Sequence, residues 1–319
     1  MNVRRQCISG VAVAAATALG LGALSGCSTD SAAAGNTDKF DVVASFYPMT
    51  FLAEQIGGSH VHVTSLTKPG QEPHDLEISA QQRVQLEESD AVLYLKNLQP
   101  TIDDAVSQSE VKTKIDAASL TTLEQHGNEV GGHAAEHDTH EGEESAGQDP
   151  HIWLDPVKYA EVAKGVGSAF EKADPDHAAD YKKNTAALVA KLDDLNTRFE
   201  EGLANTDSKV FITTHAAFGY LAERYGLTEE AISGLDPESE PSANRVKELE
   251  KMAKADGVTT VFYETLVSGK TAETVAEDAG LKTDVLDPIE GITDKSRGTD
   301  YFSVQEANLK ALQTALGAK

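Results

Sequence analysis

The sequence predicts an α/β protein of two lobes, each a mainly parallel sheet flanked by helices, joined by one long rigid helix. Short apolar segments rich in β-branched residues alternate with helical segments in both halves of the chain, which is typical of strands buried in parallel sheets. Between the halves, residues 178–203 contain no proline and only one glycine, Gly202, so a single uninterrupted helix is expected. A chain of 319 residues is long enough for two domains of ordinary size.

An N-terminal α/β lobe is expected over residues 40–175. Short, apolar, β-branched segments predict its strands, and helical stretches lie between them, for example at 49–56 and 79–88. The predicted strands are 40–46 (FDVVASF), 61–67 (VHVTSLT) and 91–95 (AVLYL).

A linker helix is predicted over residues 176–205. Its start is indicated by Asp174-Pro175-Asp176, because proline suits the first turn of a helix and acidic side chains favour the positive end of the helix dipole. A helix of this kind limits how far the two lobes could close over a ligand. The apolar residues that keep helical spacing along it are Leu188, Leu192, Leu195, Phe199 and Leu203.

The C-terminal lobe, residues 206–319, repeats the alternation of strands and helices. Helical patterns cover residues 218–225, 243–255 and 270–279. Because strands separated by helices usually pair in parallel, a second parallel sheet is expected. Its predicted strands are 209–213 (KVFIT), 260–263 (TVFY) and 283–286 (TDVL).

Residues 1–27 are predicted to be a secretory signal that is not part of the fold. Arg4 and Arg5 give it a positive start, and an apolar stretch follows over residues 8–24. The stretch ends in Leu24-Ser25-Gly26-Cys27, and this order resembles a bacterial lipoprotein signal. Cys27 would then be acylated and would hold the protein on the outer face of the cell membrane. A plain transmembrane segment is the alternative, against which the small residues and the cysteine argue.

Composition argues against nucleic acid or anionic lipid as a partner and against stabilising disulfides. The chain has 52 acidic and 27 basic residues and a net charge of −25, so nucleic acid and anionic lipid surfaces are poor partners. No disulfide is expected, because Cys7 would leave with the signal and Cys27 would carry lipid. Residues 28–39 are predicted to form a flexible polar tether.

Three histidines lie in loops where ligands collect in α/β proteins. His74 and His215 each follow a predicted strand, and His151 lies between two Asp-Pro turns. Ligands of open α/β sheets bind at the carboxyl ends of strands, and three imidazoles with one further donor suit tetrahedral zinc. Each histidine alone could equally be a hydrogen-bonded loop residue, and their spacing does not establish a site.

Five segments of the chain match a known family. They are ASFYPMTFLAEQIGG, PGQEPHDLEIS, DPHIWLDP, THAAFGYLAERYGL and GTDYFSVQEANLKAL, of which DPHIWLDP and THAAFGYL are the most specific. Through these segments, residues 40–317 resemble the metal-specific solute-binding proteins of ABC importers, the zinc and manganese receptors joined by one long helix. One departure is Leu76-Glu77-Ile78, where the family often carries an aromatic residue and Glu-Pro.

The resemblance implies that His74, His151 and His215 are the three nitrogen ligands of one metal ion, two from the N-terminal lobe and one from the C-terminal lobe. The fourth ligand would come from the loop VLDPIEG. Glu290 is favoured, because the segments after it most resemble zinc receptors with a glutamate there; Asp287 and a water molecule are the alternatives. Three imidazoles favour Zn²⁺ over Mn²⁺, which prefers more oxygen donors.

A second feature is a segment of low complexity, residues 126–149, which is rich in histidine and acid and has no lysine or arginine. Such a composition cannot bury a core. The prediction is a mobile accessory loop that collects metal weakly, as in zinc receptors of the family. A merely solvated insertion is the alternative. The histidines of the segment are His126, His133, His137 and His140.

Together these features predict an extracytoplasmic receptor that captures Zn²⁺ and delivers it to an ABC permease for import, as a monomer and without catalysing a reaction. A manganese-type receptor or a metal-binding surface adhesin of the same family is the alternative. A zinc hydrolase, from a different class, would also use three histidines and an open position. The chain has no HExxH motif and no obvious general base beside the ligands.

Overall fold

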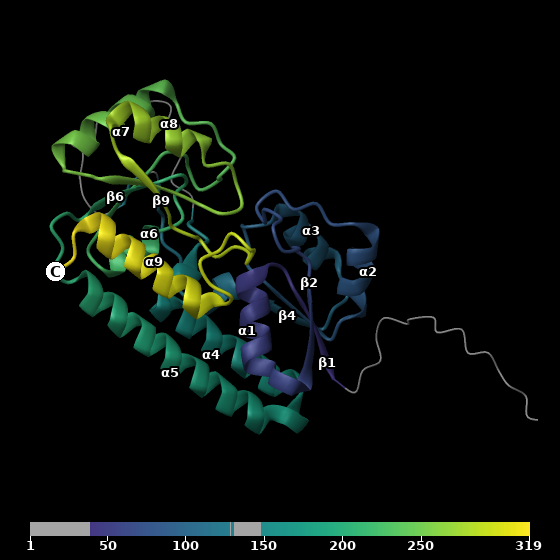
Figure 1. Ribbon diagram of the computed structural model, residues 1–319. Coiled ribbons are helices and arrows are strands. Elements are labelled where there is room, and N and C mark those ends of the chain that lie inside the picture. Colours follow the sequence, from purple (N-terminus) through teal and green to yellow (C-terminus); the bar gives the residue numbers. More distant parts are fainter. Residues whose placement is uncertain (1–38, 128, 131–147) are drawn as a thin grey trace, which may run out of the picture. The chain divides into compact units, whose positions relative to one another are not determined.

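The computed structural model describes residues 39–127, 129–130 and 148–319 (Figure 1). The predicted signal with Cys27 and the predicted tether up to residue 38 lie outside these ranges, as do His133, His137 and His140. None of the helices within the described ranges is both long enough and apolar enough to span a bilayer.

Strands and helices alternate along the described chain, with short 3₁₀ helices at several junctions. The strands are β1 (Phe40–Ala44), β2 (Val61–Ser65), β3 (Ala91–Tyr94), β4 (Thr113–Asp116), β5 (Glu129–Val130), β6 (Val210–Thr213), β7 (Thr228–Ala231), β8 (Thr260–Tyr263) and β9 (Lys282–Val285). The α-helices are α1 (Tyr47–Gly57), α2 (Ala80–Glu88), α3 (Pro100–Gln108), α4 (Pro156–Ala173), α5 (Ala178–Leu203), α6 (Gly219–Arg224), α7 (Ala243–Ala255), α8 (Lys270–Ala279) and α9 (Tyr301–Leu316). The 3₁₀ helices are η1 (Gly58–His60), η2 (Ala117–Leu120), η3 (Ile152–Leu154) and η4 (Pro175–His177).

A four-stranded parallel sheet forms in the N-terminal half, in the order β2-β1-β3-β4. Val42 of β1 lies opposite Val63 of β2 and Ala91 of β3. Val42, Val43 and Leu93 are each at most 2% exposed, although Val42 and Val43 point to opposite faces of the sheet. Both faces of the sheet are therefore covered, as the apolar sequence of these strands predicts.

The second sheet has the order β5-β7-β6-β8-β9. β7, β6, β8 and β9 are parallel, and β5 joins the edge antiparallel to β7, with Glu129 opposite Glu230. Residues 129–130, from the segment predicted as part of the N-terminal lobe, thus pair with the second sheet. The predicted fold class is confirmed, because two mainly parallel sheets with flanking helices are connected through one long helix.

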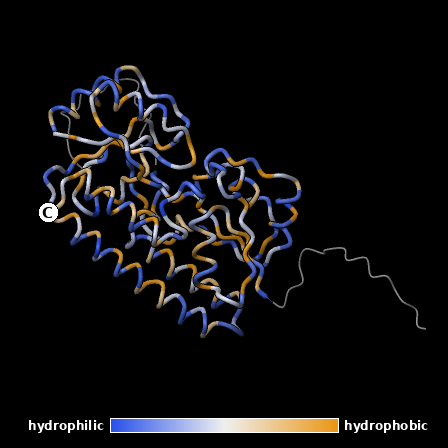
Figure 2. Tube along the Cα trace, viewed as in Figure 1, coloured by the Kyte–Doolittle hydropathy of each residue, from blue (hydrophilic) through white to orange (hydrophobic). Residues whose placement is uncertain are grey.

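The predicted long helix is α5, which has 26 residues. It contacts α1 and α4 from the first half of the chain and α9 from the second (Figure 1). Hydrophobic and hydrophilic residues alternate along it, so that one face is apolar (Figure 2). That face is buried, with every predicted apolar residue at most 1% exposed: Leu188, Leu192, Leu195, Phe199 and Leu203.

Candidate metal centre

Four of the predicted ligands meet although they lie on four separate loops. His74 lies in the loop after β2, His215 closely follows β6, and Glu290 lies in the loop after β9. His151 directly precedes η3, which leads into α4. The strands β2, β6 and β9 belong to the parallel ladders of the two sheets, so these loops leave from the ligand-binding edges expected for α/β folds.

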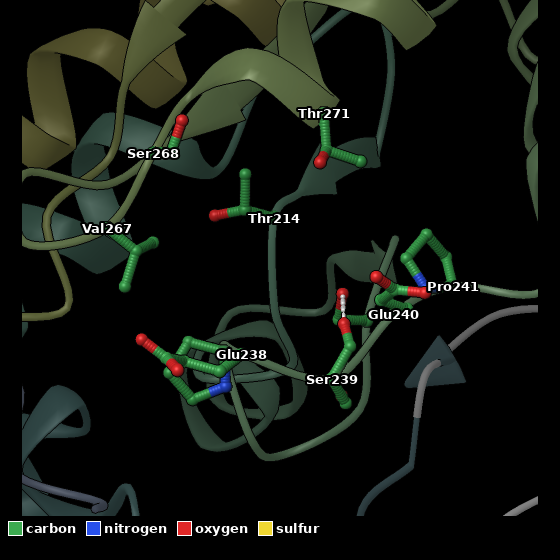
Figure 3. A pocket seen from close by; sticks show the side chains of 10 residues that line it. Thr214, Glu238, Ser239, Glu240, Pro241, Val267, Ser268 and Thr271 are labelled. Atoms are coloured by element: carbon green, nitrogen blue, oxygen red, sulfur yellow. Dashed lines mark hydrogen bonds between the residues drawn. The ribbon is translucent and has the colours of Figure 1, made fainter.

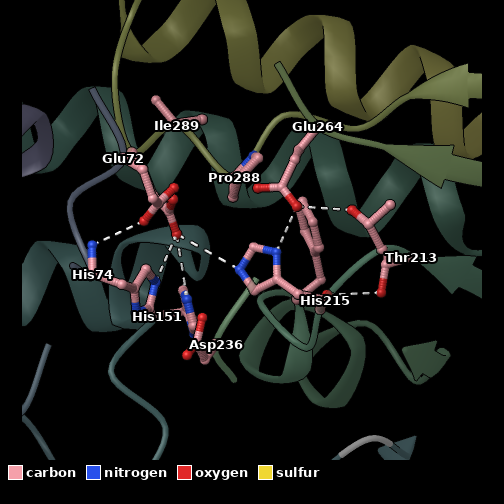
Figure 4. A network of polar contacts seen from close by, with 12 residues as sticks. Glu72, His74, His151, Thr213, His215, Asp236, Glu264, Pro288 and Ile289 are labelled. Carbon is pink, nitrogen blue, oxygen red and sulfur yellow. Dashed lines mark hydrogen bonds and ion pairs between the residues drawn. The ribbon is translucent and has the colours of Figure 1, made fainter. Parts of the chain in front are cut away.

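The imidazoles of His74, His151 and His215 lie close together (Figure 4), and the carboxylate of Glu290 contacts all three. Its Oε1 atom is 3.3 Å from Nε2 of His74, 3.4 Å from Nε2 of His151 and 3.7 Å from Nε2 of His215. In a tetrahedral zinc site with bonds of about 2.0–2.2 Å, neighbouring ligand atoms are ~3.4 Å apart. Glu290 therefore lies at about the distance from each imidazole that a tetrahedral ion requires, and all four ligand atoms lie within 4.8 Å of one another.

Two further carboxylates orient the imidazoles. Asp149 Oδ1 lies 2.7 Å from Nδ1 of His151, and Glu264 Oε1 lies 2.8 Å from Nδ1 of His215. These contacts direct the Nε2 atoms of both rings toward Glu290, and neither Nε2 atom has a hydrogen-bond partner among the described residues. Histidines that bind metals usually have such a carboxylate on the other ring nitrogen. The donor set therefore suits a cation at Nε2.

The centre is almost completely buried. The side chains of His151 and Glu290 have no exposed surface, and that of His215 is 1% exposed. His74 is the most accessible of the four, with 11% of its side chain exposed. A cation bound here would therefore be shielded from water, and His74 borders the solvent.

One protein family has a sequence profile that matches residues 42–315 of the chain. Its description is ZnuA, zinc-uptake complex component A, periplasmic. The chain belongs to this family. The match confirms the resemblance predicted from the five sequence segments, and the ZnuA family is described as part of an uptake complex and not as an enzyme family.

Individual ZnuA relatives cover different shares of the chain. The zinc-binding lipoprotein AdcA of Streptococcus pneumoniae is 36% identical over 283 residues, which are 86% of this chain and 55% of AdcA. The chain thus spans about half the length of that relative. The high-affinity zinc uptake system protein ZnuA of Bacillus subtilis is 33% identical over 320 residues, 98% of each chain.

A solved structure shows the same ZnuA fold. The crystal structure of the Zn(II)-bound ZnuA-like domain of S. pneumoniae AdcA is similar with a TM-score of 0.71 and 33% sequence identity. The similarity covers 87% of this chain and 99% of that domain. The predicted two-lobed receptor fold is therefore confirmed by comparison as well as by topology.

In this ZnuA-family chain, imidazoles and carboxylates shift one another's pKa values. Burial alone would lower the pKa of His215, but Glu264 and Glu290 outweigh burial and hold that pKa well above its ordinary value. Burial alone would raise the pKa of Glu290, but the three histidines hold it well below its ordinary value. Without a metal ion, protonated imidazole therefore balances the Glu290 charge, and a bound cation must displace protons.

Glu72 is a half-buried acid that the sequence did not indicate as a site residue. Burial, with the nearby charge of Glu290, raises the pKa of Glu72 to about 9, so the side chain is protonated at neutral pH. Its Oε1 atom accepts a hydrogen bond of 2.8 Å from the backbone N–H of His74 (Figure 4). Glu72 therefore stabilises the loop that carries the most exposed imidazole without adding a second negative charge.

Asp149 and Glu264 were also not predicted as site residues. Glu264 directly follows β8, so the rule that ligands collect at strand ends could have indicated it. Asp149 stands two residues before His151 in the specific segment DPHIWLDP. Their function as hydrogen-bond partners of ligands becomes visible only once the loops are brought together.

The alternative fourth ligand, Asp287, does not face the imidazoles. Its Oδ1 atom accepts a hydrogen bond of 2.8 Å from the backbone N–H of Ile289, and its Oδ2 atom accepts one of 3.2 Å from Thr265 Oγ1. Ile289 has a φ of 59°, a conformation that β-branched residues rarely adopt. Asp287 therefore stabilises the strained turn from which Glu290 reaches the three histidines.

Trp153 connects the loop of His151 to the loop of Glu290. Its Nε1 atom donates a hydrogen bond of 2.7 Å to the carbonyl oxygen of Pro288. The hydroxyl of Tyr301, at the start of α9, donates one of 2.7 Å to the carbonyl oxygen of Trp153. Both aromatic side chains are fully buried, so the relative positions of the two loops depend on the core.

His126 is not a mobile, solvent-exposed residue, as the predicted accessory loop would have it. It is 7% exposed, and its Nδ1 atom lies 2.6 Å from Asp149 Oδ2. The cause is local backbone pairing, since Gln125 and Gln148 form an isolated antiparallel bridge and the Asp149 N–H donates to the Glu124 carbonyl at 2.9 Å. The other three histidines predicted for this segment lie outside the described residues.

A polar cavity of about 240 Å³ lies in the C-terminal half (Figure 3). Thr214, Glu238 and Glu240 are among its lining residues, and the four clustered side chains are not. The hydroxyl of Thr214 donates a hydrogen bond of 2.8 Å to Glu264 Oε1, the atom that also contacts His215. The cavity therefore adjoins the carboxylate that orients His215, and it is not the metal cluster itself.

Glu229 of β7 gives a pH-dependent stability prediction. Burial raises its pKa to about 7 although Thr213 and the backbone N–H of Phe218 donate to it. The folded state therefore holds this proton more tightly than the unfolded chain, and stability falls as the pH rises from about 4.5 through 7. At pH 8 we expect Glu229→Gln to raise the free energy of unfolding by about 3 kcal/mol, measured with urea.

The same substitution should change stability little at pH 5, where folded Glu229 is already neutral. The matched control is the next residue, Glu230, whose carboxylate pairs with Arg245 at 2.8 Å. Glu230→Gln should destabilise the fold at both pH values, because it weakens a buried ion pair. If Glu229→Gln instead lowered the free energy of unfolding at pH 8, burial of the ionised Glu229 carboxylate would not be destabilising, and the prediction would be wrong.

Proposed function

We propose that the chain is an extracytoplasmic receptor that captures Zn²⁺ and delivers it to an ABC permease for import. The observation that carries the proposal is the convergence of three imidazole Nε2 atoms on Glu290 Oε1, at 3.3–3.7 Å, in a buried centre. Relatives named as a zinc-binding lipoprotein and a zinc uptake protein support the same cargo.

His74, His151, His215 and Glu290 are proposed as the four ligands of the ion. Three neutral imidazoles and one carboxylate suit zinc, because zinc accepts tetrahedral nitrogen and oxygen donors. Manganese favours more oxygen donors, so it should bind less tightly at this centre. The open edge at His74 supports a route by which the ion enters and leaves.

Titration of the metal-free protein with Zn²⁺ and Mn²⁺ tests the proposal. We expect one tight equivalent of zinc and weaker binding of manganese, measured by competition with a chromophoric chelator. Because ligation displaces protons from His215 and His151, whose pKa values are held above the ordinary value against the opposing effect of burial, zinc affinity should fall as the pH falls. Affinity that is constant from pH 8 to pH 5.5, or manganese binding as tight as zinc binding, would contradict this centre.

A location outside the cytoplasm, on a lipid carried by Cys27, is part of the proposal. The family description contains the word periplasmic, and the AdcA relative is named a lipoprotein, which support it. The signal 1–27 and the tether 28–39 would then precede a monomeric receptor. We expect labelled palmitate to be incorporated into the wild type and not into Cys27→Ser in producing cells, detected on a gel. Equal incorporation into both proteins would contradict a lipid on Cys27.

Capture and delivery require no reaction at the metal. With four protein donors within 4.8 Å of one another, the centre can fill four positions around zinc without a metal-activated water, in contrast to catalytic zinc sites with three protein ligands. A zinc-loaded sample that hydrolysed ester or peptide substrates would favour the hydrolase class instead.

A further inference from the structure

A second cluster of potential ligands lies outside the centre described above. Glu124, His126 and Glu223 each offer one ligand atom, and these atoms lie within 4.8 Å of one another. We propose that Glu124, His126 and Glu223 form a second site for a divalent transition-metal ion, linked to the first centre through Asp149. This inference goes beyond the proposed function, because the second site can bind whether or not the first one does.

His126 is held in the orientation that a ligand needs. Its Nδ1 atom contacts Asp149 Oδ2 at 2.6 Å, and its ring packs edge-on against Tyr220 with centroids 4.6 Å apart. Gly219 makes room for it, since a Cβ atom there would lie 2.5 Å from Nδ1 of His126. A carboxylate on one ring nitrogen leaves the other as the donor to a metal, as at His151.

Glu223 faces the remaining nitrogen, and Glu124 offers a carboxylate oxygen within 4.8 Å of the other two ligand atoms. Glu223 Oε2 lies 3.4 Å from Nε2 of His126, which equals the ligand spacing expected around zinc. With the Nδ1 proton shared with Asp149, Nε2 either carries a second proton or turns a lone pair toward a carboxylate. A divalent cation between Nε2 of His126 and the two carboxylates would bond to the nitrogen and to both carboxylates. It would replace the proton, or the repulsion between lone pair and carboxylate, that this geometry otherwise requires.

Accessibility and charge set the expected strength of the site. The side chains of Glu124 and Glu223 are 36% and 57% exposed, so an ion can reach them from solvent. Lys158 Nζ lies 2.6 Å from Glu124 Oε1 and offsets part of the negative charge. With one imidazole in place of three and a lysine nearby, the second site should bind zinc less tightly than the first.

Asp149 physically connects the two sites. Its Oδ2 atom contacts His126 and its Oδ1 atom contacts His151, while the side chain itself has no exposed surface. Its backbone is fixed as well, because its carbonyl oxygen accepts a hydrogen bond of 2.7 Å from the Tyr220 hydroxyl. An ion at either site would therefore help to orient the carboxylate that holds a ligand of the other.

The test uses the full chain with His133, His137 and His140 replaced by asparagine, so that those histidines cannot contribute bound metal. In this background we expect two equivalents of Zn²⁺ by isothermal titration, and two of Co²⁺ by absorption. Glu223→Gln should weaken the second equivalent at least ~10-fold, since even loss of an outer carboxylate costs that much, and adding Glu124→Gln should abolish it. Glu277→Gln on the exposed face of α8 is the matched control. It should leave the affinity and the number of bound zinc ions unchanged.

The outcomes separate this inference from the proposed function. His215→Ala should weaken the first equivalent about 100- to 1,000-fold and leave the affinity of the second unchanged. If the Glu124→Gln, Glu223→Gln double variant still binds two ions, the second site is overturned and the first stands. If His215→Ala binds the first ion as tightly as the wild type does, the first ligand set fails instead. As an independent readout, the ¹⁵N resonance of His126 Nε2 should move with the second equivalent, and a resonance that stays in place would also overturn the site.

Discussion

Replacement of His151 by alanine is expected to weaken zinc binding about 100- to 1,000-fold. Zinc sites with four ligands have apparent binding free energies of about 10–16 kcal/mol, so one ligand accounts for roughly 3–4 kcal/mol. His151 is fully buried and is oriented by Asp149 through both its backbone N–H and its ring. No other imidazole on the described loops can take its place, because His74 and His215 already face Glu290.

Affinity should be measured by chelator competition and the fold by circular dichroism, because the variant leaves Asp149 without one of its partners. That loss should cost about 1–3 kcal/mol of stability and should leave the protein folded. His62→Ala is the control, since His62 lies on β2 with 57% of its side chain exposed and its Nδ1 atom lies 3.1 Å from Asp41 Oδ1, away from the three imidazoles. Equal zinc affinity in the two variants would contradict the assignment of His151 as a ligand.

Glu290→Gln should have the second-largest effect and should also change the pH dependence. The amide keeps the size of the side chain but removes the charge that faces three imidazoles, so we expect a loss of about 100-fold in zinc affinity at pH 8. Because Glu290 helps to raise the pKa of His215, which burial alone would lower, the variant should hold competing protons less tightly. Its affinity should therefore fall less steeply than that of the wild type between pH 8 and pH 6.

Asp287→Asn distinguishes the two candidate fourth ligands. The asparagine oxygen can still accept the hydrogen bond from Ile289, so the strained turn should remain and zinc affinity should change by less than about threefold. Parallel chelator titrations of the two variants make the comparison. A larger loss from Asp287→Asn than from Glu290→Gln would assign the fourth ligand to Asp287.

The elements that the sequence predicted well are those whose signal is local. The linker helix was predicted over residues 176–205 and is observed as α5 over residues 178–203, with its apolar face buried as expected. Helical spacing and the absence of proline are visible without tertiary structure. The strands β1, β2, β3, β6, β8 and β9 were found from apolar, β-branched runs. β8 has its predicted bounds, whereas the ends of the other five strands differ from the prediction by one or two residues, as strand ends have no sharp boundary in the sequence.

The strand β7 was missed, for a reason that lies in tertiary contacts. Its sequence is Thr-Glu-Glu-Ala, yet all four residues are buried. Glu230 is neutralised by Arg245 from α7, and the buried carboxyl of Glu229 accepts hydrogen bonds from Thr213 and Phe218. Two acids in four residues indicate a surface turn when read alone, and only the partners explain a strand.

The candidate site likewise contains residues that the sequence indicates and residues that only the structure reveals. The three histidines could be found because they follow strands or stand in a specific segment, whereas the choice of Glu290 over Asp287 depends on the direction of each side chain. The sequence gives no measure of that direction. Asp149 shows the difference most clearly, because contact with both His126 and His151 requires the backbone pairing between residues 125 and 148.

That backbone pairing affects how far the length of the segment between residues 125 and 148 can change. The bridge between Gln125 and Gln148, with the bond from the Asp149 N–H to the Glu124 carbonyl, closes the segment between them at its base. Loop-closure entropy grows only slowly with length, so residues added between β5 and Gln148 should cost folding little and leave His126 and the β5–β7 pairing in place. A purification tag or a fluorescent reporter could therefore be inserted there without moving His151.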